Sequence, residues 1–153
     1  MSEHEIQVRK QAEKKKIQFK PYEHRTKYHE TDQQGVIHPS YYVNWMEDAR
    51  MNLMEQVGMG YQQMEEMQVF SQMISLSIEY RSPAKFEERV VVDTKLVSYD
   101  GTQMEIAYRI YDKATGEDRA IARSKHCFMN YSGIPISMKR IYPELETRFF
   151  EFQ

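Results

Sequence analysis

The chain has 153 residues, the usual length of one domain, and 41% of them are hydrophobic, enough for a core. Its formal net charge of −2 provides no broad basic surface, so nucleic acid is not expected as a partner. No stretch approaches the roughly 18 apolar residues of a membrane span. The single cysteine, Cys127, cannot form an internal disulfide, and residues 1–16 lack the apolar core of a secretion signal. We therefore expect a cytoplasmic protein that does not bind a membrane.

The amino-terminal segment is polar and differs in composition from the rest of the chain. We predict a polar arm over residues 1–20, frayed or folded as a short surface helix, and a single domain over residues 21–153. The lysine run at 14–16 is typical of a solvated surface. A first strand is predicted between Ile17 and Tyr28, with an interruption near Pro21.

A long amphipathic helix is predicted to begin at Pro39 or Ser40, because proline fits the first helical position without losing a hydrogen bond. Gly58 and Gly60 are expected to end it. The apolar residues between these limits recur at spacings of three and four and form one stripe: Tyr42, Trp45, Met46, Ala49, Leu53 and Val57. The helix is therefore expected to lie against a broad apolar surface.

The rest of the chain predicts four strands, mostly joined by hairpins. In the first of these strands the apolar residues share one parity, at Phe70, Ile74, Leu76, Ile78 and Tyr80, and Ser82-Pro83 ends the pattern. The other three are predicted over Arg89–Tyr99, Gln103–Tyr111 and Arg119–Tyr131, with turns at Asp100-Gly101 and around Gly116. A short terminal helix is predicted over Pro143–Phe150.

This order of elements predicts an α+β layer, an antiparallel sheet with one helix on one face. One helix covers only part of such a sheet. The uncovered part and the edge strands need a partner, so we expect a homodimer.

The residues before the predicted helix carry the candidate chemistry. A helix start has unpaired N–H groups and a partial positive charge, which can stabilise a developing oxyanion. Asp32 could attack or transfer a proton there, or its carboxylate could cap a turn. His38 is either a helix cap or a proton shuttle or carbonyl donor. Gly35 provides a positive φ or a close approach of the backbone to substrate.

The residues within the helix are interpreted first as structural. Tyr42, Trp45 and Met46 are expected in the core, with an acyl pocket as the alternative. Glu47 and Arg50 are spaced i and i+3 and can pair, and a catalytic Glu47 is the lesser alternative.

Other reactive residue types show no catalytic or metal-binding pattern. His24, His29 and His126 lack the spacing of metal ligands, and the Gly-x-Ser-x-Gly motif of serine hydrolases is absent. Cys127 has no base partner and is expected to be an inert core residue. No metal or cofactor is therefore predicted.

Three segments in a fixed order carry a family pattern. They are Thr31-Asp32-Gln33-Gln34-Gly35-Val36-Ile37-His38 with Tyr42, Trp45, Glu47, Ala49 and Arg50 after it, Tyr80-Arg81-Ser82-Pro83-Ala84, and Phe128-Met129-Asn130-Tyr131-Ser132-Gly133-Ile134-Pro135-Ile136. Together they resemble the hotdog-fold acyl-CoA thioesterases, and most closely the 4-hydroxybenzoyl-CoA thioesterase family, over roughly Tyr22 to Pro143. The resemblance implies an antiparallel sheet of five or six strands wrapped around one long central helix, a homodimer or homotetramer, and active sites between subunits.

The resemblance also implies the reaction. In that family the aspartate at the position of Asp32 acts as nucleophile or general base, and the amino end of the central helix polarises the thioester carbonyl. The implied function is hydrolysis of an acyl-CoA or acyl-carrier-protein thioester to the free acid and thiol. The candidate site residues are Asp32 and His38 for catalysis and Gly35, Pro39, Ser40 and Tyr42 for substrate binding.

Two features depart from the family pattern. The family's oxyanion donor is the amide at the position of Pro39, which has no N–H, so the amide of His38 or Ser40, the His38 side chain or a water has to replace it. Basic residues that some relatives place after the third strand are missing from residues 98–102. Coenzyme A would then need other cations, such as Lys85, Arg89 or Lys125.

Two alternative functions stay open at this point. An enoyl-thioester hydratase on the same fold would need an aspartate and a histidine close together, but the spacing across residues 33–37 does not match that pattern. A non-catalytic acyl-thioester-binding protein is favoured by Pro39.

Overall fold

The computed structural model describes residues 2–7 and 18–152. Residues 3–7 are helical, whereas much of the predicted arm, with its lysine run, lies outside the described residues. The elements that follow are β1 (Tyr22–Arg25), the 3₁₀ helix η1 (Tyr28–Glu30), α2 (Tyr41–Gln56), α3 (Tyr61–Glu66), β2 (Val69–Tyr80), β3 (Arg89–Tyr99), β4 (Gln103–Asp112), β5 (Asp118–Asn130), α4 (Met138–Ile141) and α5 (Glu144–Glu151).

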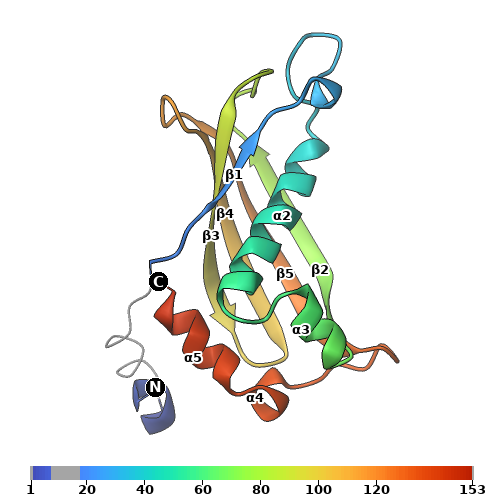
Figure 1. Cartoon of the computed structure of the whole chain (residues 1–153), viewed down its shortest axis with the longest axis vertical. Helices are drawn as coiled ribbons and strands as arrows, with labels where there is room; N and C mark the ends of the chain where they lie inside the picture. The colour runs from blue at the N-terminus through green and yellow to red at the C-terminus, as the bar shows by residue number, and fades with distance from the viewer. Residues whose placement is uncertain (1, 8–17, 153) are drawn as a thin grey trace.

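The five strands form one antiparallel sheet in the order β1-β3-β4-β5-β2. The sheet curls around α2, which runs along its concave face, while α5 lies across the end of the sheet where α2 finishes (Figure 1). The predicted α+β fold with one long central helix is confirmed. The sheet has five strands among the described residues, the lower of the two expected numbers.

Helix α2 is held against the sheet by burial of the apolar stripe that the sequence predicts. All six predicted stripe residues are at most 4% exposed: Tyr42, Trp45, Met46, Ala49, Leu53 and Val57. Burying side chains of this size stabilises the fold by about 1.5–3 kcal/mol each, which outweighs the ordinary helix propensity of the segment. The helix begins at Tyr41, just after the predicted start, and Gly58 follows its end with a φ of +80°.

Strand β2 differs from the single alternation predicted for it. Phe70 pairs with Met129 and Ile78 pairs with Ala122, and these two partners lie on opposite faces of β5. A register shift between Met73 and Ser75 is the cause. Such a bulge moves every later side chain to the other face, so Phe70 and Ile78 do not share a face as predicted.

The hairpins and the terminal helix follow the prediction closely, while two short α-helices, α3 and α4, and the 3₁₀ helix η1 were not predicted. Asp100 accepts hydrogen bonds from the amides of Gln103 and Thr102. These bonds, together with one from the Asp100 amide itself, lower the pKa of the Asp100 carboxyl, although burial acts in the opposite direction. The predicted terminal helix is α5. Helices α3 and α4 have six and four residues, too few for a periodic apolar pattern.

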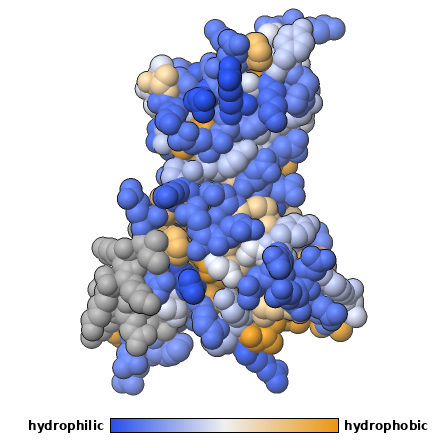
Figure 2. Space-filling model, in the orientation of Figure 1, coloured by the Kyte–Doolittle hydropathy of each residue, from blue (hydrophilic) through white to orange (hydrophobic). Residues whose placement is uncertain are grey.

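The surface is mostly hydrophilic on the face shown in Figure 2, where hydrophobic atoms appear in small patches rather than one continuous area. Strand β2 is an edge strand of 12 residues, and within residues 2–7 and 18–152 nothing pairs with its outer edge. In those same ranges no helix has the length and apolar character needed to cross a bilayer.

Candidate active site

The loop that carries Asp32 joins η1 to α2 and is closed on itself. Thr31 and Ile37 pair across its base, and the Asp32 amide donates a hydrogen bond to the Val36 carbonyl at 2.8 Å. Gly35 has a φ of +79°, and a Cβ added there would meet no described atom within 4 Å. The left-handed backbone, not a close approach, is therefore what favours glycine at this position.

The two carboxylate oxygens of Asp32 have different surroundings. Oδ1 accepts hydrogen bonds from the amides of Gln34 at 2.8 Å and Val36 at 3.3 Å. No group in the described part of the chain hydrogen-bonds to Oδ2. Asp32 thus caps its own turn with one oxygen and keeps the other for water or a ligand.

Asp32 lines a cavity of about 320 Å³, here called the Asp32 cavity, which opens between the loop, the start of α2 and the link after β2. Tyr80 forms part of its wall, donates its hydroxyl to the Pro39 carbonyl at 2.9 Å, and meets the Tyr42 ring edge to face at 5.1 Å. Burial raises the pKa of Tyr80, so its hydroxyl stays protonated and keeps this bond. Sequence patterns do not predict this role; they only place Tyr80 at the start of a family segment. The lining residues are Asp32, Val36, Ile37, Pro39, Tyr42 and 80–83.

The amides at the start of α2 already have partners. The His38 amide donates to the Glu30 carbonyl at 2.8 Å, and the Tyr41 amide donates to the His38 carbonyl at 3.1 Å. The Ser40 amide instead donates to the side chain of His38, at Nδ1, over 3.2 Å. A side-chain rotation can therefore release the Ser40 amide, whereas the His38 amide is held by the main chain.

The His38 ring is exposed and lies against Ser40, the residue just before α2. Its Nδ1 lies 2.8 Å from Ser40 Oγ and accepts from the Ser40 amide. Neither His38 nor Ser40 lines the Asp32 cavity. Of the six predicted site residues, the structure brings Asp32, Pro39 and Tyr42 together at this cavity and leaves Gly35, His38 and Ser40 beside it.

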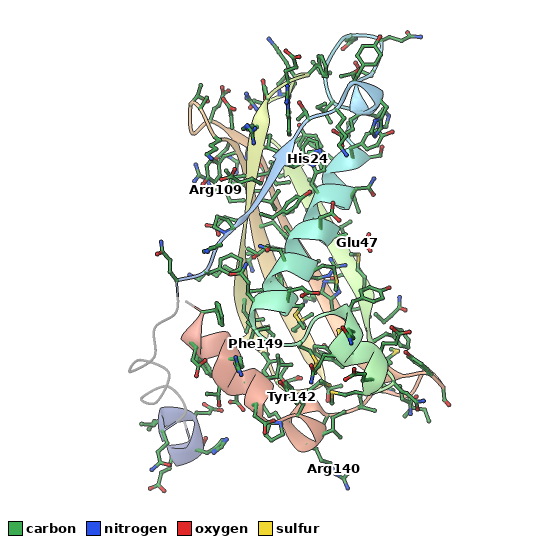
Figure 3. All side chains as sticks on the ribbon, viewed as in Figure 1. His24, Glu47, Arg109, Arg140, Tyr142 and Phe149 are labelled. Atoms are coloured by element: carbon green, nitrogen blue, oxygen red, sulfur yellow. The ribbon has the colours of Figure 1, made fainter. Side chains whose placement is uncertain are left out.

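A buried carboxylate, Glu30, fixes the base of the Asp32 loop. It accepts hydrogen bonds from Trp45 Nε1 at 2.8 Å and the Lys27 amide at 2.6 Å, and His24 Nε2 lies 3.0 Å away. Burial alone would raise the pKa of Glu30, but the hydrogen bonds from His24, Trp45 and Lys27 lower it below its ordinary value. His24 lies beside the first half of α2 (Figure 3). Sequence analysis did not predict this role for Glu30, because its side-chain partners His24 and Trp45 come from β1 and α2.

A second cavity, of about 380 Å³, lies farther along α2, between that helix, α3 and the beginning of β2. Its walls are rich in methionine, a flexible side chain that adapts to irregular shapes. Glu47 and Arg50 also line it, but no ion pair joins either to another described residue, so the pairing expected from their spacing is not formed. We call this space the methionine cavity. Its lining residues are Glu47, Arg50, Met51, Met54, Tyr61, Met64, Glu65, Val69, Phe70, Ser71, Met104 and Tyr131.

A chain of polar groups runs through the core near this cavity. Tyr108 Oη lies 2.6 Å from Ser124 Oγ, which lies 2.7 Å from His126 Nε2, and Arg50 donates to Tyr108 at 3.4 Å. His126 is fully buried, and its Nδ1 has no partner in the described part of the chain. Burial, aided by the positive charge of Arg50, lowers the pKa of His126 from 6.5 to about 4. The imidazole is therefore neutral at pH 7.

The three cations expected to meet coenzyme A are not equivalent. Lys85 pairs with Val36 of the Asp32 loop, whereas Lys125 lies in β5 opposite Ser75 and Glu105. Arg89 begins β3 opposite Arg25. Only Lys85 is thus directly attached to the loop that carries Asp32.

Comparison with known proteins decides the family. Residues 26–148 match the family described as the Thioesterase-like superfamily. This chain belongs to that superfamily. It is 34% identical, over 124 residues, to a candidate acyl-CoA thioesterase, YneP, of Bacillus subtilis (strain 168), a match that covers 80% of this chain and 89% of that protein.

Solved structures of similar proteins agree with this thioesterase-like family. A DHNA-CoA thioesterase from Staphylococcus aureus superposes with a TM-score of 0.80 at 25% identity, over 87% of this chain and 89% of that one. A hypothetical protein from Thermus thermophilus, TT1821, superposes with a TM-score of 0.75 at 29% identity, over 82% and 95% of the two chains. The predicted relationship to hotdog-fold thioesterases is confirmed.

Proposed function

We propose that this chain hydrolyses acyl-CoA thioesters to a free acid and coenzyme A, with the Asp32 cavity as the reaction site. The observation that carries the proposal is the half-paired carboxylate of Asp32, which lines a cavity at the start of the central helix in a member of the thioesterase-like superfamily. No metal or cofactor is required, because a thioester is already reactive and its thiolate can leave without strong acid assistance.

Asp32 acts as general base or as nucleophile. As general base, its Oδ2 takes a proton from water while the water oxygen bonds to the carbonyl carbon; the carbon–sulfur bond then breaks and the proton passes to the thiolate. As nucleophile, its oxygen bonds to the carbonyl carbon and the carbon–sulfur bond breaks, which releases the thiolate and leaves a mixed anhydride; water then hydrolyses the anhydride to the free acid and Asp32, and the thiolate takes the proton that is released. Because Oδ1 is fixed by the amides of Gln34 and Val36, the carboxylate needs little reorganisation in either route.

The Ser40 amide is the best candidate to replace the oxyanion donor that Pro39 lacks. It is held by the imidazole of His38, not by a carbonyl, so rotation of one exposed side chain would leave the N–H free to donate to a substrate. His38 is accordingly assigned a gating position and not the role of proton shuttle. Donation from a helix start adds the partial positive charge of the helix dipole to the hydrogen bond.

The site is completed by a second copy of the chain. Antiparallel pairing of two β2 edges about a twofold axis near the bulge would place Tyr80 of one copy close to Val69 of the other. Tyr80 lines the Asp32 cavity and Val69 lines the methionine cavity. In such a homodimer the acyl group of a thioester held at Asp32 would enter the methionine cavity of the partner.

The test is release of free thiol from a panel of aliphatic and aromatic acyl-CoA substrates, with Asp32→Asn as the matched variant. The asparagine Oδ1 still accepts from the amides of Gln34 and Val36, so the turn is retained. We expect kcat to fall by about 10²–10⁴ with an unchanged melting temperature. Full activity in Asp32→Asn would contradict the assignment.

The two alternative functions give different results in the same experiment. A hydratase would change the absorbance of crotonyl-CoA without releasing thiol. A non-catalytic binding protein would bind acyl-CoA in calorimetry while wild type and Asp32→Asn release thiol equally slowly. Either outcome would replace the proposal.

A further inference from the structure

Two aromatic side chains stand out in solvent beside the Asp32 loop. Tyr28 in η1 is 76% exposed, and Phe86 in the link between β2 and β3 is 45% exposed. Their rings meet edge to face, with centroids 5.7 Å apart and planes at 83°. The two segments lie at the same end of the molecule, where α2 begins (Figure 1). Exposed aromatic surface of this kind, next to a cavity, is typical of a binding site.

The buried Thr26 fastens the two segments to each other. Its hydroxyl donates to the Lys85 carbonyl at 2.7 Å and accepts from the Glu88 amide at 3.0 Å. Its own amide donates to the Glu88 carbonyl at 2.9 Å. Tyr28 follows two residues after Thr26, and Phe86 follows one residue after Lys85, so both rings project from a rigid base.

The turn that presents Phe86 has an unusual backbone. The Glu88 amide donates to the Lys85 carbonyl across residues 85–88, and Glu87 in the third position has a φ of +67°. A positive φ at this turn position normally requires glycine or asparagine. A non-glycine residue in this region is strained, and such strain is concentrated at ligand-binding sites.

Positive charge accompanies the aromatic pair. Lys27 and Lys85 are both exposed, and neither forms an ion pair with any residue in the ranges 2–7 and 18–152. The carboxylate of Glu88, in the same turn as Lys85, is bound by Arg119 at 3.2 Å. Glu87 is the one carboxylate of the turn that stays in solvent.

The aromatic pair is connected to the reaction site through main-chain contacts. Lys85 pairs with Val36, the Ile37 amide donates to the Ala84 carbonyl at 2.8 Å, and the Val36 carbonyl accepts from the Asp32 amide. The segment that carries Lys85 and Phe86 therefore adjoins Val36, which lines the Asp32 cavity.

We propose that Tyr28 and Phe86, with Lys27 and Lys85, bind the nucleotide end of coenzyme A, a purine base that carries phosphates. This inference rests on the proposed thioesterase function and names the part of the substrate that function leaves unassigned. The base stacks on the exposed rings, because every purine has an aromatic face. The two ammonium groups neutralise phosphate charge. The site replaces the basic turn that is missing from residues 98–102, and it makes coenzyme A the carrier.

The test compares ligands with and without the nucleotide. Calorimetry with free coenzyme A is expected to show about tenfold weaker binding for Tyr28→Ala and for Phe86→Ala than for wild type. Lys85→Gln is expected to weaken binding at low salt and to lose that effect at high salt. Ile141→Ala is the control, because Ile141 is 46% exposed and lies in α4, at the other end of the molecule.

Kinetics separate this proposal from the thioesterase proposal. For an acyl-CoA, Tyr28→Ala and Phe86→Ala should raise KM about tenfold without changing kcat; for the matching acyl-pantetheine, which lacks the nucleotide, they should change nothing. Equal KM values for the two substrates in wild type, equal loss on both substrates in the variants, or coenzyme A binding unaffected by the variants would each overturn the nucleotide site. Failure of wild type to cleave either of the two substrates would instead overturn the thioesterase proposal, while calorimetry with free coenzyme A still tests the nucleotide site.

Discussion

The Asp32 cavity and the methionine cavity lie at opposite ends of β2 and are built in different ways. The Asp32 cavity is made of loops and turns whose polar groups are fixed by main-chain hydrogen bonds and by the buried Glu30 carboxylate. The methionine cavity is made of helix and strand side chains, and four of its twelve lining residues are methionines. One cavity specifies the position of polar atoms, while the other offers an apolar space that can change shape.

This difference matches two demands of the proposed reaction. The carboxylate and the oxyanion donor have to be placed within a fraction of an ångström, because small displacements cost large factors in rate. An acyl group has few directional contacts and needs only a space of suitable volume. Four changes would break or sharpen the contrast between the two regions.

The largest effect on stability is expected for Glu30→Ala. It leaves the Trp45 indole N–H, the Lys27 amide and the His24 ring without their acceptor. Removing one member of a buried charged network costs about 3–5 kcal/mol, measured as the free energy of unfolding in urea. The control is Glu79→Ala, which removes an exposed pair with Arg81 and should cost under about 1 kcal/mol. Equal costs for both variants would contradict a fixing role for Glu30.

In the methionine cavity, Met54→Ala is expected to lower the free energy of unfolding by about 2–3 kcal/mol, near the lower end for buried methionine because the space beside it is already open. The enlarged space should shift kcat/KM toward longer acyl chains. Met51→Ala, at a half-buried residue of the same cavity, should cost less stability. An unchanged chain-length profile in both variants would remove this cavity from the acyl site.

The buried His126 predicts a pH effect on stability. Its folded pKa of about 4 lies below the unfolded value near 6.5, so the unfolded chain binds more protons between these values. The free energy of unfolding therefore keeps this contribution above about pH 6.5 and loses it as the pH falls toward 4. Urea unfolding at about pH 7 and pH 5 should show a smaller decrease for His126→Gln than for wild type. The same change at the exposed His29 serves as control, and an identical decrease in wild type and His126→Gln would contradict the assignment.

The smallest effect is expected for His38→Ala. Because the His38 ring covers the Ser40 amide and lies outside the Asp32 cavity, its loss should reduce kcat less than about tenfold. Loss of an oxyanion donor typically costs about 10²–10³. A hundredfold decrease in kcat would show that the imidazole itself takes part in the reaction.

The elements with a long periodic pattern were predictable from the sequence. The stripe from Tyr42 to Val57 predicts α2, and the β-branched run Arg89–Tyr99 predicts β3 with both of its observed ends. The bulge between Met73 and Ser75 was not predictable, because alternation of apolar and polar residues does not show where one strand has an extra residue relative to its partner.

The candidate site was predictable only in part. Asp32 and the start of α2 are close together in the sequence, so a local sequence pattern predicts both. Tyr80 contacts Pro39, 41 positions earlier in the chain, and Glu30 contacts Trp45, 15 positions later. Those contacts exist only once the sheet has closed around α2. Sequence periodicity cannot report such pairs, because each partner shows a local pattern that is consistent with an ordinary strand or loop.

The single sulfhydryl of Cys127 has a practical consequence for measuring the proposed reaction. It is 4% exposed within β5, and buried thiols of this kind are inert toward disulfide reagents. A colorimetric disulfide dye added to the folded protein would therefore record only the sulfur that leaves the substrate, with no background from the polypeptide. In denaturant the same dye would count one equivalent per chain, so a single reagent can follow both turnover and the loss of native structure.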